Sequence, residues 1–201
     1  MCPVFAKFST NSYNINMLYT RKGDGGTTKT FGCDQRISKS SLVAEALGSL
    51  DEANSFLGIA RAKTVDMNFN IGTGDIKFSD LILETQQNLF IVQAEVAGST
   101  LSITQDKITK IETIVDEIEK VLPPIKNFFI SGATELGGIF DFARTLSRRA
   151  ERRVIAAKEE GKIKVSPETL SYLNRLSSLL YALARIASHN EGTPELKPDY
   201  K

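Results

Sequence analysis

From Ser40 to the end of the chain, apolar residues recur three and four positions apart, the spacing that places them on one face of an α-helix. This pattern predicts five helices, over about 41–61, 80–97, 104–122, 139–160 and 167–189. The connections between them differ in length, and no internal repeat or low-complexity stretch interrupts the series. We therefore expect an all-α five-helix bundle, for which 201 residues is the size of one domain.

Residues at the ends of these segments sharpen the prediction. Ser40 is a suitable N-cap for the first helix, and Ser166 followed by Pro167 is typical of a helix start. The stretch 64–79 loses the helical period and predicts a long connection. Segment 80–97 is apolar on nearly all sides, so we expect this helix to be the central one.

The chain ends and the cysteines bear on organisation and location. Residues 1–17 lack the apolar core of a signal peptide, and no apolar run approaches the roughly 18 residues of a membrane span. Cys2 and Cys33 are too few for a disulfide framework. We expect a flexible segment over 1–17, one domain over 18–190, a flexible tail over 191–201, and a cytoplasmic protein without a membrane partner.

The segment from Met17 to Gly32 departs from the helical pattern. It reads MLYT and then RKGDGGTTKT, an extended run that meets a Gly/Thr loop, which predicts a short strand or hairpin beside the bundle. Glycines let backbone N–H groups converge on an anion, while Thr, Lys and Arg add donors. A Walker A loop is excluded, because Thr28 stands where that motif needs glycine and no helix follows. A phosphate loop and an ordinary glycine-rich turn both remain open.

The fourth predicted helix carries arginines along one face. At about 100° per residue, Arg144, Arg148 and Arg152 fall on one side, and the apolar residues of 139–154 fall on the other. Five arginines and one glutamate give residues 144–153 a net charge of +4, so the rest of the chain carries −3 of the total of +1. This focused charge favours a small polyanion or facing carboxylates. A solvated helix face with i,i+4 ion pairs is the alternative.

Other polar residues narrow the function classes. Asn174 and Arg175 lie beside core leucines and need either a partner on another helix or a place on the rim, unless they bind a ligand. The Asp51-Glu52 pair predicts at least one carboxylate that faces an arginine of another helix.

His189 is the only histidine, so it cannot form a histidine metal cluster. The near-neutral total charge and the lack of interleaved aromatics argue against an RNA-binding helix, and we expect no nucleic-acid partner.

Taken together, the motifs of this chain resemble a family, the PduO-type ATP:cob(I)alamin (corrinoid) adenosyltransferases. In family order they read YTRKGDGGTTKTFG, then Lys39, ALGSLDEANSFLG, FFISGAT, ARTLSRRAERRV and YLNRLS, over about Leu18 to His189. The resemblance implies a homotrimer of five-helix bundles that binds ATP between adjacent subunits and the corrinoid nearby. It also implies Mg²⁺ with the ATP, a reductase, and a client mutase that takes the product.

The resemblance implies a role for each matching residue. The contacts to the triphosphate and Mg²⁺ fall on Thr20, Arg21, Lys22, Gly23, Thr28, Lys29 and Lys39. Further contacts to the nucleotide fall on Arg148, Arg149, Glu151, Arg152 and Asn174. Asp51 and Arg144 match an acid and an arginine that pair in the family, where they support the bound ATP and the subunit contact. Phe128 matches the aromatic that crowds the lower face of cobalamin.

Three positions depart from the family pattern. Ser131-Gly132-Ala133-Thr134 stands in place of Pro-Gly-Gly-Thr, Ser178 in place of an aspartate, and Ala94-Glu95-Val96 in place of a more polar segment. We expect these positions to line the corrinoid side or the trimer contact. The resemblance implies transfer of the 5′-deoxyadenosyl group of ATP to Co(I), and the alternative is a carrier of the same fold that binds nucleotide or corrinoid without turnover.

Overall fold

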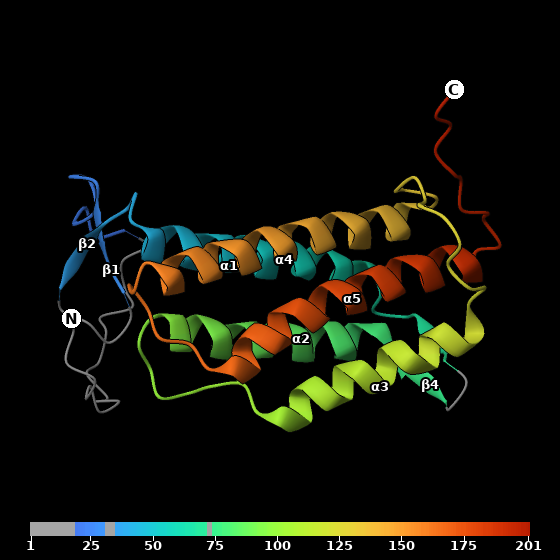
Figure 1. The fold of residues 1–201 in the computed structure, drawn as a ribbon, viewed down its shortest axis with the longest axis horizontal. Helices are drawn as coiled ribbons and strands as arrows, with labels where there is room; N and C mark the ends of the chain where they lie inside the picture. The colour runs from blue at the N-terminus through green and yellow to red at the C-terminus, as the bar shows by residue number, and fades with distance from the viewer. Residues whose placement is uncertain (1–18, 31–34, 72–73) are drawn as a thin grey trace.

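The computed structural model describes residues 19–30, 35–71 and 74–201. Its five helices lie side by side along the long axis of the molecule (Figure 1). They are α1 Leu42–Lys63, α2 Phe78–Val96, α3 Gln105–Val121, α4 Glu135–Glu159 and α5 Pro167–Asn190. Helix α4 packs on α5 and α1, α1 packs on α2, and α3 packs on α5. The predicted all-α five-helix bundle is confirmed.

The most deeply buried helix is α5, which corrects the expectation for segment 80–97. Nearly every position of α5 from Leu176 to Ser188 is buried. Helix α2 instead leaves Leu83 39 % and Phe90 62 % exposed in the single chain. An apolar composition on all sides therefore did not identify the central helix, because two of the apolar side chains of α2 face outward.

Helix α4 begins four residues earlier than predicted, at Glu135. The hydroxyl of Thr134 accepts a hydrogen bond from the backbone N–H of Gly137 at 3.0 Å and caps the helix. Gly137 is part of this first turn, and a Cβ there would lie 2.6 Å from Oγ of Ser188 on α5. Gly137 therefore allows α4 and α5 to approach each other closely. In the sequence alone, a glycine at this position is typical of a loop. The first helix is likewise capped by Ser41, one residue after the predicted cap.

The predicted long connection between α1 and α2 contains a second small hairpin. Strands β3, Asn68–Asn70, and β4, Asp75–Lys77, pair antiparallel with Phe69 opposite Ile76. Phe69 stacks on Phe78, the first residue of α2, with 3.8 Å between the ring centres. This contact anchors the hairpin and lets α2 start two residues before the predicted Asp80.

A hairpin forms as predicted, but its strands lie elsewhere. Strand β1, Thr27–Lys29, pairs antiparallel with β2, Arg36–Ser38, which leads into α1. Strand β1 falls in the predicted Gly/Thr loop, β2 follows Gly32, and Tyr19 and Thr20 of the predicted extended run are not in a strand. The hairpin lies at the end of the bundle where α1 begins and α4 ends (Figure 1). The predictions for residues 1–17, Cys2 and Cys33 lie outside the described residues.

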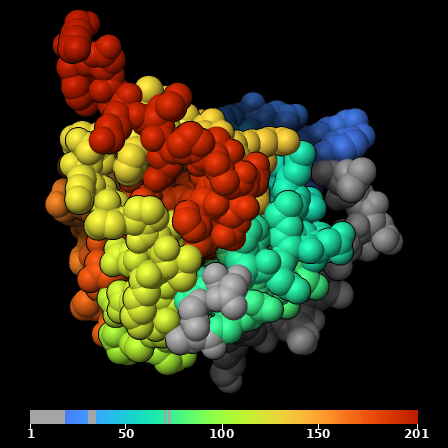
Figure 2. All heavy atoms as spheres, turned by 90° about the vertical axis from the view of Figure 1, so that its right-hand side faces the viewer, coloured from blue at the N-terminus to red at the C-terminus, as the bar shows by residue number. Residues whose placement is uncertain are grey.

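The C-terminal segment 191–201 lies across the opposite end of the bundle. Figure 2 shows these red residues beside the yellow connection between α3 and α4. The backbone N–H of Ile130 donates to the carbonyl of Leu196 at 2.8 Å. The flexibility of this tail stays a prediction. In the described part of the chain, none of the helices has the length and apolar composition of a membrane span.

Candidate active site

The arginine face of α4 comprises Arg144, Arg148, Arg149, Arg152 and Arg153. It lies opposite Ala143, Leu146, Ala150 and Val154, all of which are buried. Arg148, Arg152 and Arg153 are exposed, whereas Arg144 and Arg149 are half-buried. The predicted separation of charge and core on this helix is therefore what the structure has.

Two of these arginines form ion pairs with α1. Arg149 pairs with Glu52, and Arg153 pairs with Glu45 at 3.5 Å. The Glu52 contact confirms that a carboxylate of the Asp51-Glu52 pair faces an arginine of another helix. Within the described part of the chain, Arg148 and Arg152 form no ion pair. The carboxylates of α1 thus neutralise part of the face, and two guanidinium groups remain available to a polyanion.

The amide of Asn174 lies against this face from α5. Its Nδ2 donates to Oε1 of Glu151 at 3.1 Å, and its Oδ1 accepts from Arg175 at 3.0 Å. Arg175 in turn donates to Glu112 of α3 at 2.7 Å. These contacts are the interhelical hydrogen bonds that the sequence left as one option. They hold Glu151 and Asn174 together beside Arg148.

Arg144 has an unsatisfied donor. Its Nε lies 3.8 Å from Oδ1 of Asp141, and its guanidinium carbon lies 5.9 Å from the ring centre of Tyr181. The Nε has no hydrogen-bond partner among the described residues. A buried donor left unpaired costs about 1–3 kcal/mol. Asp51 is exposed on α1 and makes no ion pair with any described residue of the same chain. One chain therefore does not bring Asp51 and Arg144 together.

A pocket of about 870 Å³ opens beside Arg144 and Arg148. Its other walls are Ser178 and Tyr181 of α5, the connection between α3 and α4, and the C-terminal segment. Phe128 of that connection is 80 % exposed, so its ring is free to contact a ligand. Burial raises the pKa of the Tyr181 phenol above its usual value, and the carboxylates of Glu195 and Asp141 add to this, against Arg185 and Arg144.

The glycine-rich loop is folded around two basic residues. The ammonium of Lys39 lies 3.2 Å from the point where a Cβ on Gly23 would stand, so the structure brings these two predicted phosphate contacts together. Arg36 donates to the hydroxyl and the carbonyl of Thr27, each at 2.7 Å, and also to the carbonyl of Lys22. Gly26 closes the turn with φ of 76°, a conformation that favours glycine.

The other predicted phosphate contacts of this loop lie before the turn or in β1. Arg21 adopts a positive φ of 57° and lies with its guanidinium carbon 5.4 Å from the ring centre of Tyr19. The hydroxyl of Thr20 accepts from the backbone N–H of Lys22 at 3.4 Å. Thr28 and Lys29 are in β1, where neighbouring side chains alternate between the two faces of the hairpin.

Sequence reasoning missed Arg36 as the residue that holds this loop. Its three acceptors lie on the opposite strand and in the turn, so no periodic pattern marks it. It also missed Arg185, which lies in the wall of the Phe128 pocket. A charged residue among the apolar positions of a predicted helix was the available signal there.

The three departures from the family pattern fall in two places. Ser131 and Ser178 line the Phe128 pocket, and their place on the corrinoid side stays a prediction. Glu95 lies elsewhere, which corrects the expectation for Ala94-Glu95-Val96. Its side chain, on α2, is buried against the start of α5. There it accepts hydrogen bonds from the backbone N–H of Ser166 at 2.6 Å and from the hydroxyl of Thr169. It stabilises the first turn of α5, because a carboxylate there satisfies free N–H donors.

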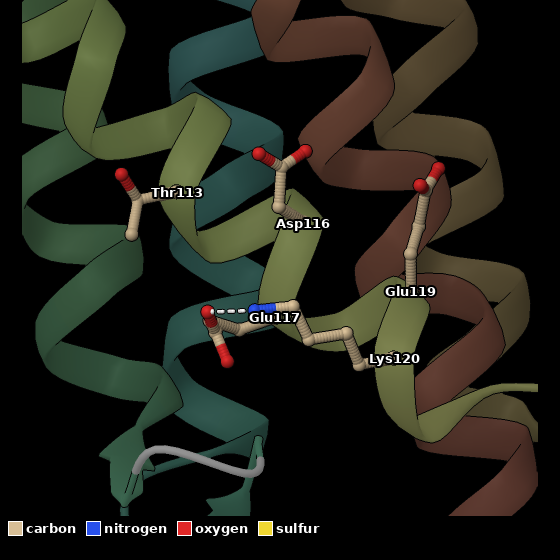
Figure 3. Close-up of a pocket in the computed structure, with 5 residues that line it drawn as sticks. All are labelled: Thr113, Asp116, Glu117, Glu119 and Lys120. Carbon is tan, nitrogen blue, oxygen red and sulfur yellow. Dashed lines mark hydrogen bonds and ion pairs between the residues drawn. The ribbon is translucent and has the colours of Figure 1, made fainter.

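A second depression lies on the surface of α3. Figure 3 shows its five residues, Thr113, Asp116, Glu117, Glu119 and Lys120. Lys120 pairs with Glu117 at 2.6 Å. None of the predicted site residues lines this depression, and its acidic character does not suit a polyphosphate.

The fold and the site define a class: a helical bundle with an arginine face and an adjoining pocket suited to a polyanionic ligand. The cobalamin adenosyltransferase family matches residues 18–187, and the chain belongs to this family. The corrinoid adenosyltransferase PduO of Salmonella typhimurium is 36 % identical over 175 residues, which are 84 % of this chain and 48 % of that protein. The corrinoid adenosyltransferase of Bacillus subtilis is 34 % identical over 187 residues, 90 % of this chain and 91 % of that protein.

Solved structures show the same fold. A variant of the PduO-type ATP:corrinoid adenosyltransferase from Lactobacillus reuteri, complexed with cobalamin and ATP, superposes with a TM-score of 0.79 at 27 % identity. The match covers 92 % of this chain and 97 % of that one. A second variant, complexed with ATP, gives a TM-score of 0.77 at 28 % identity over 90 % of this chain and 100 % of that one. The chain spans about half the length of the Salmonella relative, 48 %, and nearly all of the Bacillus one, 91 %.

Proposed function

We propose that this chain is an ATP:corrinoid adenosyltransferase, which moves the 5′-deoxyadenosyl group of ATP to the Co(I) of a corrinoid and releases triphosphate. The main support for the proposal is that Arg148, which has no ion pair among the described residues, lines a large pocket with an exposed aromatic. Arg148 lines the Phe128 pocket, and Arg152 follows one turn later on the same face. The Lactobacillus reuteri relative was crystallised with both ATP and cobalamin, which supports the same pair of substrates here.

The reaction explains why the site needs cations more than a base. Co(I) is itself the nucleophile: the Co–C5′ bond forms, the C5′–O bond breaks, and the bond's electron pair leaves with the triphosphate. Cobalt goes from Co(I) to Co(III), and no proton has to move. The protein must orient ATP and stabilise charge on the leaving group, which is the usual task of Arg, Lys and Mg²⁺.

In this proposal the glycine-rich loop and the arginine face hold the nucleotide. Thr20, Arg21, Lys22, Gly23 and the residues Thr28 and Lys29 of β1 contact the triphosphate, and Lys39 supports them from beside Gly23. The contacts from α4 and α5 are Arg148, Arg149, Glu151, Arg152 and Asn174. Mg²⁺ binds through phosphate oxygens, which it prefers together with water, and not through a cage of protein ligands.

Phe128 acts on the corrinoid. Its ring is exposed and lines the pocket, which supports the proposal that it fills the space below the corrin plane. Excluding the lower axial ligand removes electron donation to cobalt, so Co(II) becomes easier to reduce to Co(I). This role separates Phe128, which acts on the reduction, from Arg148, which acts on the nucleotide.

We propose that the active site is completed by a second copy in a homotrimer. The glycine-rich hairpin and the connection that carries Phe128 lie at opposite ends of one bundle (Figure 1), so one chain does not assemble the whole set. The free Nε of Arg144 and the exposed Asp51 suit a pair between subunits. Large exposed apolar side chains, which mark interaction surfaces, lie on three helices. They are Ile59, Leu83, Phe90 and Phe142.

The test is a spectral assay with ATP, Mg²⁺ and chemically reduced cob(I)alamin. We expect the corrin absorption spectrum to change to that of adenosylcobalamin, with triphosphate released in equal amount. ATP binding without product would instead support the carrier, an alternative favoured by the changed residues Ser131 and Ser178 in the pocket. Beyond the assay, the proposal includes a cytoplasmic location, a reductase that supplies Co(I), and a mutase that receives the product.

A further inference from the structure

Arg185 is a charged side chain buried in the wall of the Phe128 pocket. It lies on α5, and only 5 % of it is exposed. Its Nε donates to both carboxylate oxygens of Glu195, at 3.2 and 3.1 Å, and its terminal nitrogen donates to the carbonyl of Pro123 at 3.0 Å. A buried guanidinium is costly unless it is paired and hydrogen-bonded, so these partners define a specific arrangement.

The partners of Arg185 come from two other segments of the chain. Glu195 belongs to the C-terminal segment, and Pro123 opens the connection between α3 and α4. Farther along that connection, the ring centre of Phe129 lies 5.4 Å from the guanidinium carbon of Arg185. The C-terminal segment also contacts the connection directly, because the N–H of Ile130 donates to the Leu196 carbonyl at 2.8 Å.

These contacts are made on both sides of Phe128. Pro123 lies before it, and Phe129 and Ile130 lie after it, whereas the Phe128 ring itself is exposed in the pocket. The backbone on either side of the ring is thus fixed to α5 and to the C-terminal segment. Figure 2 shows that the C-terminal residues lie over this end of the molecule, beside the connection.

We propose that Arg185, with Glu195 as its counter-ion, is a positioning residue that holds residues 123–130 in place and so keeps the Phe128 ring over the pocket. The expected effect on the rate of turnover rests on the proposed function. The expected loosening of the connection does not. The helices do not need Glu195, since α5 already packs on α4 and α3. Loss of this carboxylate therefore loosens the connection and leaves the bundle folded.

The experiment compares the full chain with its Glu195→Gln variant. This change keeps the shape of the side chain and avoids Arg185, whose own replacement would leave a hole in the buried wall. The matched control is Glu191→Gln, the same change in the same segment at an exposed carboxylate with no ion pair among the described residues. Hydrogen exchange by mass spectrometry follows residues 123–133. The rate of adenosylcobalamin formation is measured from cob(II)alamin with a reductant and from preformed cob(I)alamin, and ATP affinity by titration.

We expect Glu195→Gln to speed exchange over 123–133 by about tenfold, the effect of losing one charge-assisted hydrogen bond, with exchange in α1 and α4 unchanged. The rate from cob(II)alamin should fall by about fivefold or more, whereas the rate from cob(I)alamin and the ATP affinity should stay within about twofold. Glu191→Gln should match the original chain. Unchanged exchange over 123–133 would overturn the proposal, and so would faster exchange with an unchanged rate from cob(II)alamin. If the original chain itself gives no product, the proposed function fails, and the exchange result alone decides the positioning role.

Discussion

Arg148 and Arg153 are on the same face of α4 but differ in what they contact. Arg153 pairs with Glu45 at 3.5 Å, whereas Arg148 has no ion pair in the described part of the chain and lines the Phe128 pocket. We expect Arg148→Ala to weaken ATP binding about tenfold and to lower turnover by about a hundredfold, because a cation aimed at the leaving triphosphate is lost. Calorimetric titration with ATP and the spectral assay measure both. Arg153→Ala is the control, and an equal loss in both variants would contradict the assignment.

Phe128 gives a second prediction at the scale of a single residue. We expect Phe128→Ala to leave ATP affinity within about twofold, since the ring lies away from the glycine-rich loop, and to slow the reaction from cob(II)alamin by about tenfold or more. The same variant started from cob(I)alamin is its own control, because reduction is then complete before mixing. A rate from cob(II)alamin equal to that of the original chain would show that the lower-face role is wrong.

Only some residues of the candidate site could be predicted from the sequence. The helical period was enough to place Arg148 and Arg152 on one face, because core and charge separate cleanly at 3.6 residues per turn. Arg36 and Arg185 were not found, since their partners are backbone carbonyls and a carboxylate brought close only by the tertiary fold. The position of Glu95 inside the bundle was likewise hidden, because its partners are on α5.

Among the helices, α4 and α5 approach each other closely at Gly137. A Cβ on Gly137 would lie 2.6 Å from Oγ of Ser188 and 3.2 Å from the carbonyl of Ala184. We expect Gly137→Ala to destabilise the protein by about 1–3 kcal/mol, as overpacking of a tight contact does. Denaturant unfolding followed by circular dichroism measures this.

Gly138 is the control for that change. A Cβ there would meet Gly132 at 3.4 Å, with nothing nearer, so Gly138→Ala should change the free energy of unfolding by less than about 1 kcal/mol. Similar losses in the two variants would contradict the account of the close approach.

The start of α4 was the main error at the helix scale. Residues 126–138 contain small residues and three glycines, a composition typical of a loop. The structure includes Gly137 and Gly138 in the helix, and α5 lies too close to Gly137 for a larger side chain there. Four of the five helices were placed to within about two residues at each end, since their caps and apolar faces agreed with the tertiary packing.

Across the molecule, the two parts of the candidate site, the glycine-rich hairpin and the Phe128 region, lie apart from each other. The glycine-rich hairpin lies where α1 begins, and the connection that carries Phe128 leads into α4 at the other end of the bundle (Figure 1). Asp51 and the free Nε of Arg144 find no partner in each other within one chain. The sequence could predict each part but not their separation, because helix length and direction decide which residues share an end of the bundle. The proposed homotrimer, in which a neighbouring copy supplies the missing half, would account for both facts.

Activity recovery in mixed oligomers tests this account most directly. Lys39→Ala removes the loop contact and Arg148→Ala removes the arginine contact, so each variant alone should be nearly inactive. Co-expressed in equal amounts, they should recover about a quarter of the original activity. In a closed ring, each site combines the loop of one chain with the arginine face of its neighbour, so about a quarter of the sites then have both parts intact. Co-expression of Arg148→Ala with Arg152→Ala should recover nothing, since neither chain has an intact face. A Lys39→Ala and Arg148→Ala mixture no more active than the average of its two components would contradict the shared site.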